Sequence, residues 1–124
     1  LDVGADAILV SNHGGRQLDG ALSTIRSLPQ VVRAVGDQME VYLDGGIRSG
    51  QDVLKALAMG AKSTFIGRSY LYGLGAMGQA GVTSALQVIQ KEIDITMALC
   101  GVQHARDFSR EHVLVPEGFE GRWE

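Results

Sequence analysis

The chain has 124 residues, of which 45% are hydrophobic and 20% charged, and its formal net charge is −3. This balance is typical of a single globular domain and excludes a mainly disordered chain. The negative charge also argues against nucleic acid or an anionic membrane as a partner, so a bound anion must be held by a few local arginines.

The first half of the chain predicts two strands and a helix. Residues 7–10 are continuously apolar, which is typical of a strand buried on both faces of a parallel sheet. Helical spacing follows over 22–35, and Pro29 predicts that the helix proper starts close to it. A second strand is predicted over 41–43. Residues 1–6 resemble a helix end and a turn, without an initiator methionine, so we expect a piece of a longer chain.

The next segment predicts a helix with clear ends. Ser49 is an N-cap candidate, and Asp52 three residues later completes a capping box. Gly60 is a natural C-terminal cap. A third strand is predicted over 64–66, so this part is one strand–helix–strand unit with parallel strands.

Beyond residue 68 the sequence predicts helices and then an irregular surface tail. A short helix is expected over 69–77 and a longer one over 82–99, whose charges exclude a membrane span. Cys100, the only cysteine, cannot form an internal disulfide, which fits our expectation of a cytoplasmic protein. Residues 102–124 form the predicted tail of a single domain, 1–124.

Three parallel strands with helices on one side are an incomplete structure. An open parallel sheet needs helices on both faces, and a barrel needs eight strands. The repeated βα units favour an α/β fold that is part of a (β/α)8 barrel. Because such an arc has unpaired edges and an exposed inner face, we expect further chain to complete it.

Each predicted strand ends in a glycine-marked polar turn, where (β/α)8 proteins bind ligands. Arg48 and Arg68 follow the second and third strands, and each precedes a predicted helix. Guanidinium groups and free helix amides together suit a phosphate. The alternative is that Arg48 and Arg68 are ordinary solvated loop residues. Asp44 either accepts hydrogen bonds from ligand hydroxyls or forms an ordinary Asp-Gly turn.

The turn after the first strand carries the candidate reactive groups, His13 and Arg16. An imidazole can take a proton at neutral pH, and a guanidinium can hold and orient a carboxylate. The other two histidines, His104 and His112, are expected at the surface. The three histidines lack metal-ligand spacing, so no metal is expected.

The nine residues Ser11-Asn12-His13-Gly14-Gly15-Arg16-Gln17-Leu18-Asp19 resemble the signature of the FMN-dependent 2-hydroxy acid oxidases and dehydrogenases. Glycolate oxidase, flavin-type L-lactate dehydrogenase, lactate oxidase and mandelate dehydrogenase belong to that family. The resemblance continues through 43–48, 52–61 and 66–68. It implies FMN, a homo-oligomer (a tetramer) and a TIM barrel, of which this chain holds strands six to eight with their helices.

The resemblance also implies roles by position. His13 is the catalytic base, Arg16 binds the substrate carboxylate and Ser11 contacts the flavin. The residues implied to hold FMN through its ribityl phosphate are Asp44, Gly45, Gly46, Ile47, Arg48, Gly67 and Arg68. The implied reaction oxidises a small L-2-hydroxy acid to the 2-oxo acid, by a hydride or a carbanion route. Because the earlier strands are absent, the isolated chain is expected to be inactive without the N-terminal part of the barrel.

Other functions stay open at this point. The chain can be a non-catalytic half-barrel that binds a phosphate or flavin, or have a purely structural role. A relative of inosinate dehydrogenase would also hold a phosphate. That group needs a nucleophilic cysteine in a mobile loop, whereas Cys100 lies at a predicted helix end.

Overall fold

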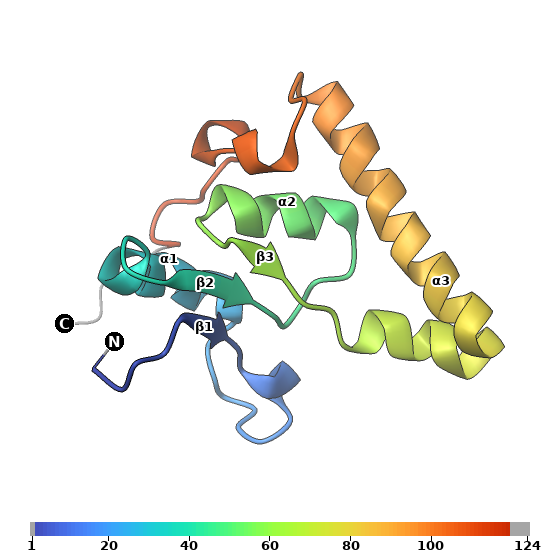
Figure 1. Ribbon diagram of the computed structural model, residues 1–124, viewed down its shortest axis with the longest axis horizontal. Helices are drawn as coiled ribbons and strands as arrows, with labels where there is room; N and C mark the ends of the chain where they lie inside the picture. Colours follow the sequence, from blue (N-terminus) through green and yellow to red (C-terminus); the bar gives the residue numbers. More distant parts are fainter. Residues whose placement is uncertain (1, 120–124) are drawn as a thin grey trace.

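The computed structural model describes residues 2–119, so residues 120–124 of the predicted tail lie outside it. Its elements are β1 (Ala7–Val10), η1 (His13–Gly15), α1 (Thr24–Val35), β2 (Glu40–Leu43), α2 (Gly50–Ala58), β3 (Ser63–Thr64), α3 (Arg68–Leu99), η2 (Ala105–Asp107) and η3 (Arg110–His112). The strands form one parallel sheet in the order β1-β2-β3 (Figure 1). The predicted parallel arrangement is therefore confirmed.

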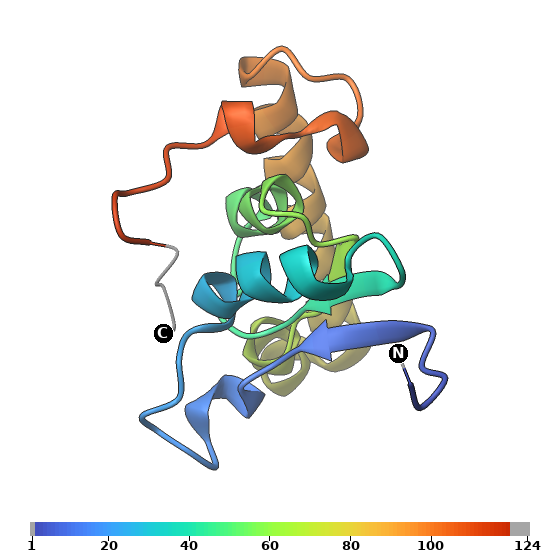
Figure 2. The same ribbon diagram turned by 90° about the vertical axis from the view of Figure 1, so that its left-hand side faces the viewer.

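Helices α1 and α2 cover one face of this sheet (Figure 2). Val10 and Leu43 point to that face and pack with Leu28 of α1 and Ala56 of α2 in the main core. Leu28 and Leu43 are completely buried. Removing such a side chain from water stabilises the fold by about 1.5–3 kcal/mol. The core therefore lies between the sheet and these helices.

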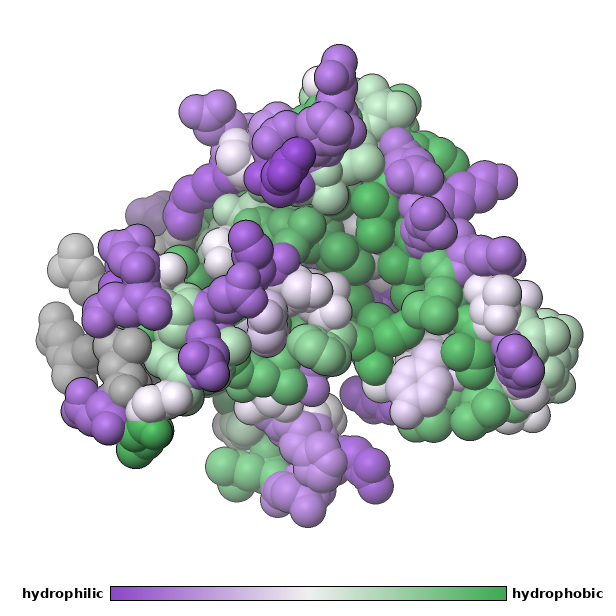
Figure 3. Space-filling view, viewed as in Figure 1, coloured by the Kyte–Doolittle hydropathy of each residue, from purple (hydrophilic) through white to green (hydrophobic). Residues whose placement is uncertain are grey.

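The opposite face of the sheet is open in the part of the chain that the structure describes. Leu9 and Phe65 are 43% and 50% exposed. The Phe65 ring meets Tyr42 edge-on, with 5.9 Å between centroids. Figure 3 shows apolar side chains gathered between the sheet and α3 on the viewed face. The prediction that β1 is buried on both faces is wrong for the described chain, because neither a strand beyond β1 nor a second layer covers it.

Two predicted element boundaries differ from the structure. Helix α1 begins at Thr24 and contains Pro29, so the predicted start near the proline is wrong. Pro29 removes one helical hydrogen bond, but its ring and Leu28 are buried against the core, and that packing holds the helix. Strand β3 is only Ser63–Thr64, although the Phe65 amide still donates to the Leu43 carbonyl at 2.8 Å.

Helix α3 consists of two helical segments, 68–76 and 79–99, close to the predicted helices over 69–77 and 82–99. Met77 and Gly78 leave the helical conformation, with φ of −144° and 58°. The segments cross at glycines: a Cβ on Gly81 would lie 1.8 Å from the Gly73 carbonyl oxygen. Among the described residues, no helix has the length and apolar character needed to cross a membrane.

The tail returns over α2 and is anchored by apolar side chains. Phe108 is 5% exposed and packs with Leu54 and Ala58. His112 stacks on the Phe108 ring at a centroid distance of 4.8 Å. This packing gives the described part of the tail a fixed path despite its lack of regular helix or strand.

Candidate active site

The three strands end at one edge of the sheet, and the turns that follow them meet there. They enclose a cavity of about 250 Å³. All of the predicted site residues except Ser11 line it: His13, Arg16, Asp44, Gly45, Gly46, Ile47, Arg48, Gly67 and Arg68. Residues separated by more than 50 positions in the sequence, such as His13 and Arg68, are thus brought together by the parallel strand order.

The turn after β1 winds in the left-handed sense. His13, Gly14 and Gly15 have φ of 53°, 64° and 71°, and His13 is the single non-glycine residue with positive φ in the described chain. The preceding side chains hold this turn: Ser11 Oγ accepts from the His13 amide at 3.1 Å, and Asn12 Oδ1 accepts from the Gly14 amide at 3.0 Å. Such strain costs about 1–3 kcal/mol and clusters at functional sites.

Ser11 holds the turn through its hydroxyl group and does not line the cavity. Its hydroxyl is exposed and accepts from the backbone of His13 at 3.1 Å. The role that the structure gives Ser11 is therefore to hold the histidine's main chain. Its contact with a flavin stays a prediction.

Of two residues that the sequence reasoning missed, one holds the connection between β1 and α1 and the other joins it to the second turn. Asn12 Nδ2 donates to the Leu22 carbonyl at 3.1 Å. Thr24, which is 3% exposed, donates to the Asp44 carbonyl at 2.6 Å. A Cβ on Gly45 would lie 3.1 Å from both Asn12 Oδ1 and Thr24 Oγ1, so glycine is needed for this contact. Asn12 had a local signal, since asparagine two residues before a glycine favours an Asx-turn.

Asp44 presents an acceptor without a protein partner. Its Oδ1 is buried and makes no hydrogen bond within the described residues. A buried carboxylate oxygen in this state is costly, so it suits a hydroxyl donor of a ligand in the cavity. Gly46 and Gly67 have open space where a Cβ would stand, which leaves their backbone accessible. These features fit a polyol that carries an anionic group.

The N-terminus of α2, directly after Arg48, is closed by protein carboxylates. Asp52 Oδ2 accepts from the amides of Arg48 and Ser49, both at 3.0 Å, and Ser49 Oγ accepts from the Asp52 amide at 3.2 Å. Glu92 Oε2 accepts from the Gly50 amide at 2.7 Å. The predicted capping box is confirmed. The prediction that this helix end offers free amides to an anion is wrong for the amides that Asp52 and Glu92 occupy. The Gln51 amide has no partner among the described residues, but Gln51 does not line the cavity.

The N-terminus of α3 is open. Its N-cap is Gly67, which has no side chain to cap it, and the amides of Arg68 and Ser69 have no partner among the described residues. The Ser69 hydroxyl turns back to the Ile47 carbonyl at 2.9 Å. Arg68 Nη2 reaches to 3.5 Å from the Cβ position of Gly14. Free amides, the positive end of the helix dipole and two arginines therefore make this end of the cavity suitable for an anion.

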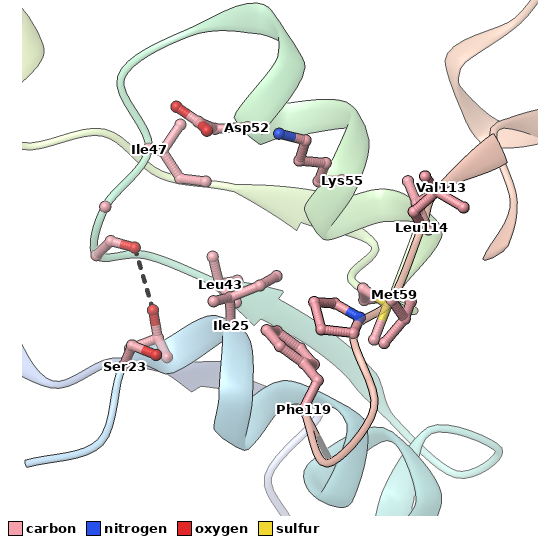
Figure 4. A pocket seen from close by; sticks show the side chains of 15 residues that line it. Ser23, Ile25, Leu43, Ile47, Asp52, Lys55, Met59, Val113, Leu114 and Phe119 are labelled. Atoms are coloured by element: carbon pink, nitrogen blue, oxygen red, sulfur yellow. Dashed lines mark hydrogen bonds between the residues drawn. The ribbon is translucent and has the colours of Figure 1, made fainter.

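A second cavity, of about 350 Å³, lies between α1, α2 and the tail (Figure 4). Apolar side chains dominate its lining, including Ile25, Met59, Val113 and Phe119. None of the histidines or arginines of the predicted site lines it. The cavity at the strand ends therefore remains the candidate active site.

Comparison with known proteins places the chain among flavoproteins. The family model described as FMN-dependent dehydrogenase matches residues 1–115. Pre-mycofactocin synthase of Mycobacterium tuberculosis is 55% identical over 121 residues, which are 96% of this chain and 30% of that protein. L-lactate dehydrogenase of Caulobacter vibrioides is 57% identical over 102 residues, which are 82% of this chain and 27% of that protein.

A solved structure has the same arrangement of elements. A mandelate oxidase variant with a monooxide FMN adduct matches with a TM-score of 0.83 and 48% identity, over 88% of this chain and 35% of that one. This likeness confirms the prediction of part of a TIM barrel. The chain spans about a third of the length of the curated relatives it matches, 30% for the mycobacterial protein. By the match over residues 1–115, this chain belongs to the FMN-dependent dehydrogenase family.

Proposed function

We propose that this chain supplies three βα units of an enzyme that oxidises a small L-2-hydroxy acid to the 2-oxo acid with FMN. One observation carries the proposal: the turns after three successive strands line one cavity that holds His13 and Arg16 together with Arg48 and Arg68. These residues would supply a proton acceptor, a group that binds the substrate carboxylate and a binding site for an anion, at the edge of the sheet where barrel enzymes act.

The described residues fit the ribityl phosphate of FMN. Asp44 Oδ1 is a free acceptor for a ribityl hydroxyl. Arg48, Arg68, the accessible backbone at Gly67 and the free amides of α3 would hold the phosphate. When bound, FMN supplies the acceptor for the two electrons that the substrate loses.

The chain's own part in the reaction is to bind, orient and deprotonate the substrate. Arg16 pairs with the substrate carboxylate, and His13 takes the proton of its hydroxyl group. The left-handed turn, held by Ser11 and Asn12, presents the imidazole to the cavity. Both reactive side chains are exposed in the described chain. The isolated chain is therefore expected to be inactive until the remaining barrel excludes water from the site.

The test uses the full-length protein that carries this segment. L-lactate, glycolate or mandelate added without oxygen should bleach its flavin absorbance. His13→Ala should keep the bound FMN but slow this bleaching by about 10²- to 10⁴-fold, the usual contribution of a general base. A loaded variant that is reduced at the wild-type rate would remove His13 from the mechanism. A wild-type protein that binds FMN but is reduced by no hydroxy acid supports the non-catalytic flavin-binding half-barrel instead.

A second candidate is the reaction of the pre-mycofactocin synthases. The observation in its favour is coverage, because the mycobacterial relative matches 96% of this chain and the lactate dehydrogenase 82%. Turnover of the mycobacterial enzyme's substrate, with no bleaching by hydroxy acids, would favour this candidate. The tetrameric assembly and the cytoplasmic location stay predictions under either one.

A further inference from the structure

Both segments of α3 hold the loop that carries Arg48. From the first segment, the Ser69 hydroxyl donates to the Ile47 carbonyl at 2.9 Å. From the second segment, Glu92 Oε2 accepts from the Gly50 amide at 2.7 Å. The two bonds lie on either side of Arg48 in the sequence. Figure 1 shows the second segment rising from the kink past the N-terminal end of α2.

The contact at Gly50 is a direct approach of two backbones. Gly50 is buried, and a Cβ there would lie 2.3 Å from the Ile93 amide nitrogen and 2.6 Å from the Glu92 carbonyl carbon. The crossing of Gly73 and Gly81 fixes the angle between the segments in a similar way. The Glu92 backbone is therefore fixed against the N-terminus of α2, with its carboxylate at the Gly50 amide.

The negative charge of Glu92 also favours its contact with the Gly50 amide. Glu92 is half-buried and sits at the positive end of the α2 dipole, where a carboxylate is stabilised. A hydrogen bond to an ionised acceptor is also about twice as strong as a neutral one. Asp52 holds the neighbouring amides of Arg48 and Ser49. The backbone on both sides of Arg48 is thereby anchored, while its side chain lines the cavity.

We propose that Glu92 is a positioning residue for the cofactor phosphate. It touches no ligand; it holds the N-terminus of α2 so that Arg48 stays across the same cavity as Arg68. This inference rests on the proposed FMN site. The local sequence around Arg48 carries no sign of it, since Glu92 lies 42 residues beyond Gly50.

The experiment compares two ligands that differ only in the phosphate. FMN and riboflavin are titrated into the full-length apoprotein of wild type, Glu92→Ala and Glu92→Gln. In Glu92→Ala we expect FMN to bind about 5- to 10-fold more weakly and riboflavin to change by less than about twofold. Glu92→Gln, which keeps an acceptor for the Gly50 amide, should recover most of the FMN affinity.

The matched control is Asp94→Ala, which removes an exposed carboxylate two residues further along the same helix. It should leave both affinities unchanged. Equal losses for FMN and riboflavin in Glu92→Ala, or an unchanged FMN affinity, would overturn the inference. If Glu92→Ala does not fold, the same comparison applies to Glu92→Gln with a smaller expected loss of about 2- to 3-fold. A wild-type protein that binds neither ligand instead refutes the proposed FMN site.

Discussion

The N-termini of α2 and α3 stand at the same edge of the sheet, and each lies beside a site arginine, yet their first amides differ in how many are hydrogen-bonded. At α2, Asp52 and Glu92 accept the hydrogen bonds of the first amides. At α3, Gly67 offers no cap, and the first amides are free within the described residues. Both helices point a positive dipole end toward the strand ends, but among the described residues the free amides that belong to cavity-lining residues are those of Arg68 and Ser69 at α3, whereas the one free amide at α2, that of Gln51, lies outside the lining.

In the proposed phosphate site, this difference gives the two βα units separate tasks. The closed helix end holds its arginine through the backbone and adds to stability. The open helix end leaves both its amides and its arginine for the anion. Substitutions at the closed end should therefore act mainly on stability, and on phosphate affinity only where they release the backbone around Arg48, as proposed for Glu92, whereas substitutions at the open end should act mainly on phosphate affinity.

The largest effect is expected at the open end. Arg68→Met removes the guanidinium at the start of α3 while keeping much of the side chain's length. We expect FMN affinity of the full-length apoprotein to fall about 100-fold, equivalent to about 2.7 kcal/mol, and riboflavin affinity to change little. Titration followed by flavin fluorescence measures both. An equal loss for both ligands would show that Arg68 acts on folding and would break the comparison.

A smaller effect is expected where α2 meets α3. Gly50→Ala places a Cβ 2.3 Å from the Ile93 amide nitrogen, so the helices must separate. We expect the free energy of unfolding to fall by about 1–3 kcal/mol, measured by denaturant titration of the full-length protein.

Gly75→Ala is the control for this change, because nothing lies within 4 Å of its added Cβ. It should be neutral or stabilise the protein by up to about 1 kcal/mol. Equal free energies of unfolding for the two variants would mean that α2 and α3 can separate at Gly50 without cost. The close packing of these helices would then contribute nothing measurable to stability.

The smallest effect is expected from the cap itself. Ser49→Ala removes the acceptor for the Asp52 amide, while Asp52 still accepts from the backbone of Arg48. The free energy of unfolding should fall by about 1 kcal/mol, and FMN affinity should stay within about twofold. A loss of FMN affinity without a loss of stability would show that the closed end takes part in phosphate binding.

Several structural features of this chain were predictable because they depend on residues that are close together in the sequence. The capping box at Ser49 and Asp52 and the break near Met77 depend on residues close in sequence, and both were predicted. The start of α1 was predicted wrongly, because burial of Leu28 and Pro29 outweighs the helix-breaking tendency of proline. Thr24 was missed as a support of the site, since its partner Asp44 lies 20 residues away.

By itself the sequence determined which residues follow each strand, because a strand end and its turn are set by neighbouring residues. It therefore identified His13, Arg16, Arg48 and Arg68 as one set. The local capping box already predicted that Asp52 bonds amides at the start of α2, and only the tertiary structure decided that the Gly50 amide is bonded as well. That bond depends on where packing delivers the Glu92 carboxylate, a side chain from a distant helix whose position no local pattern encodes.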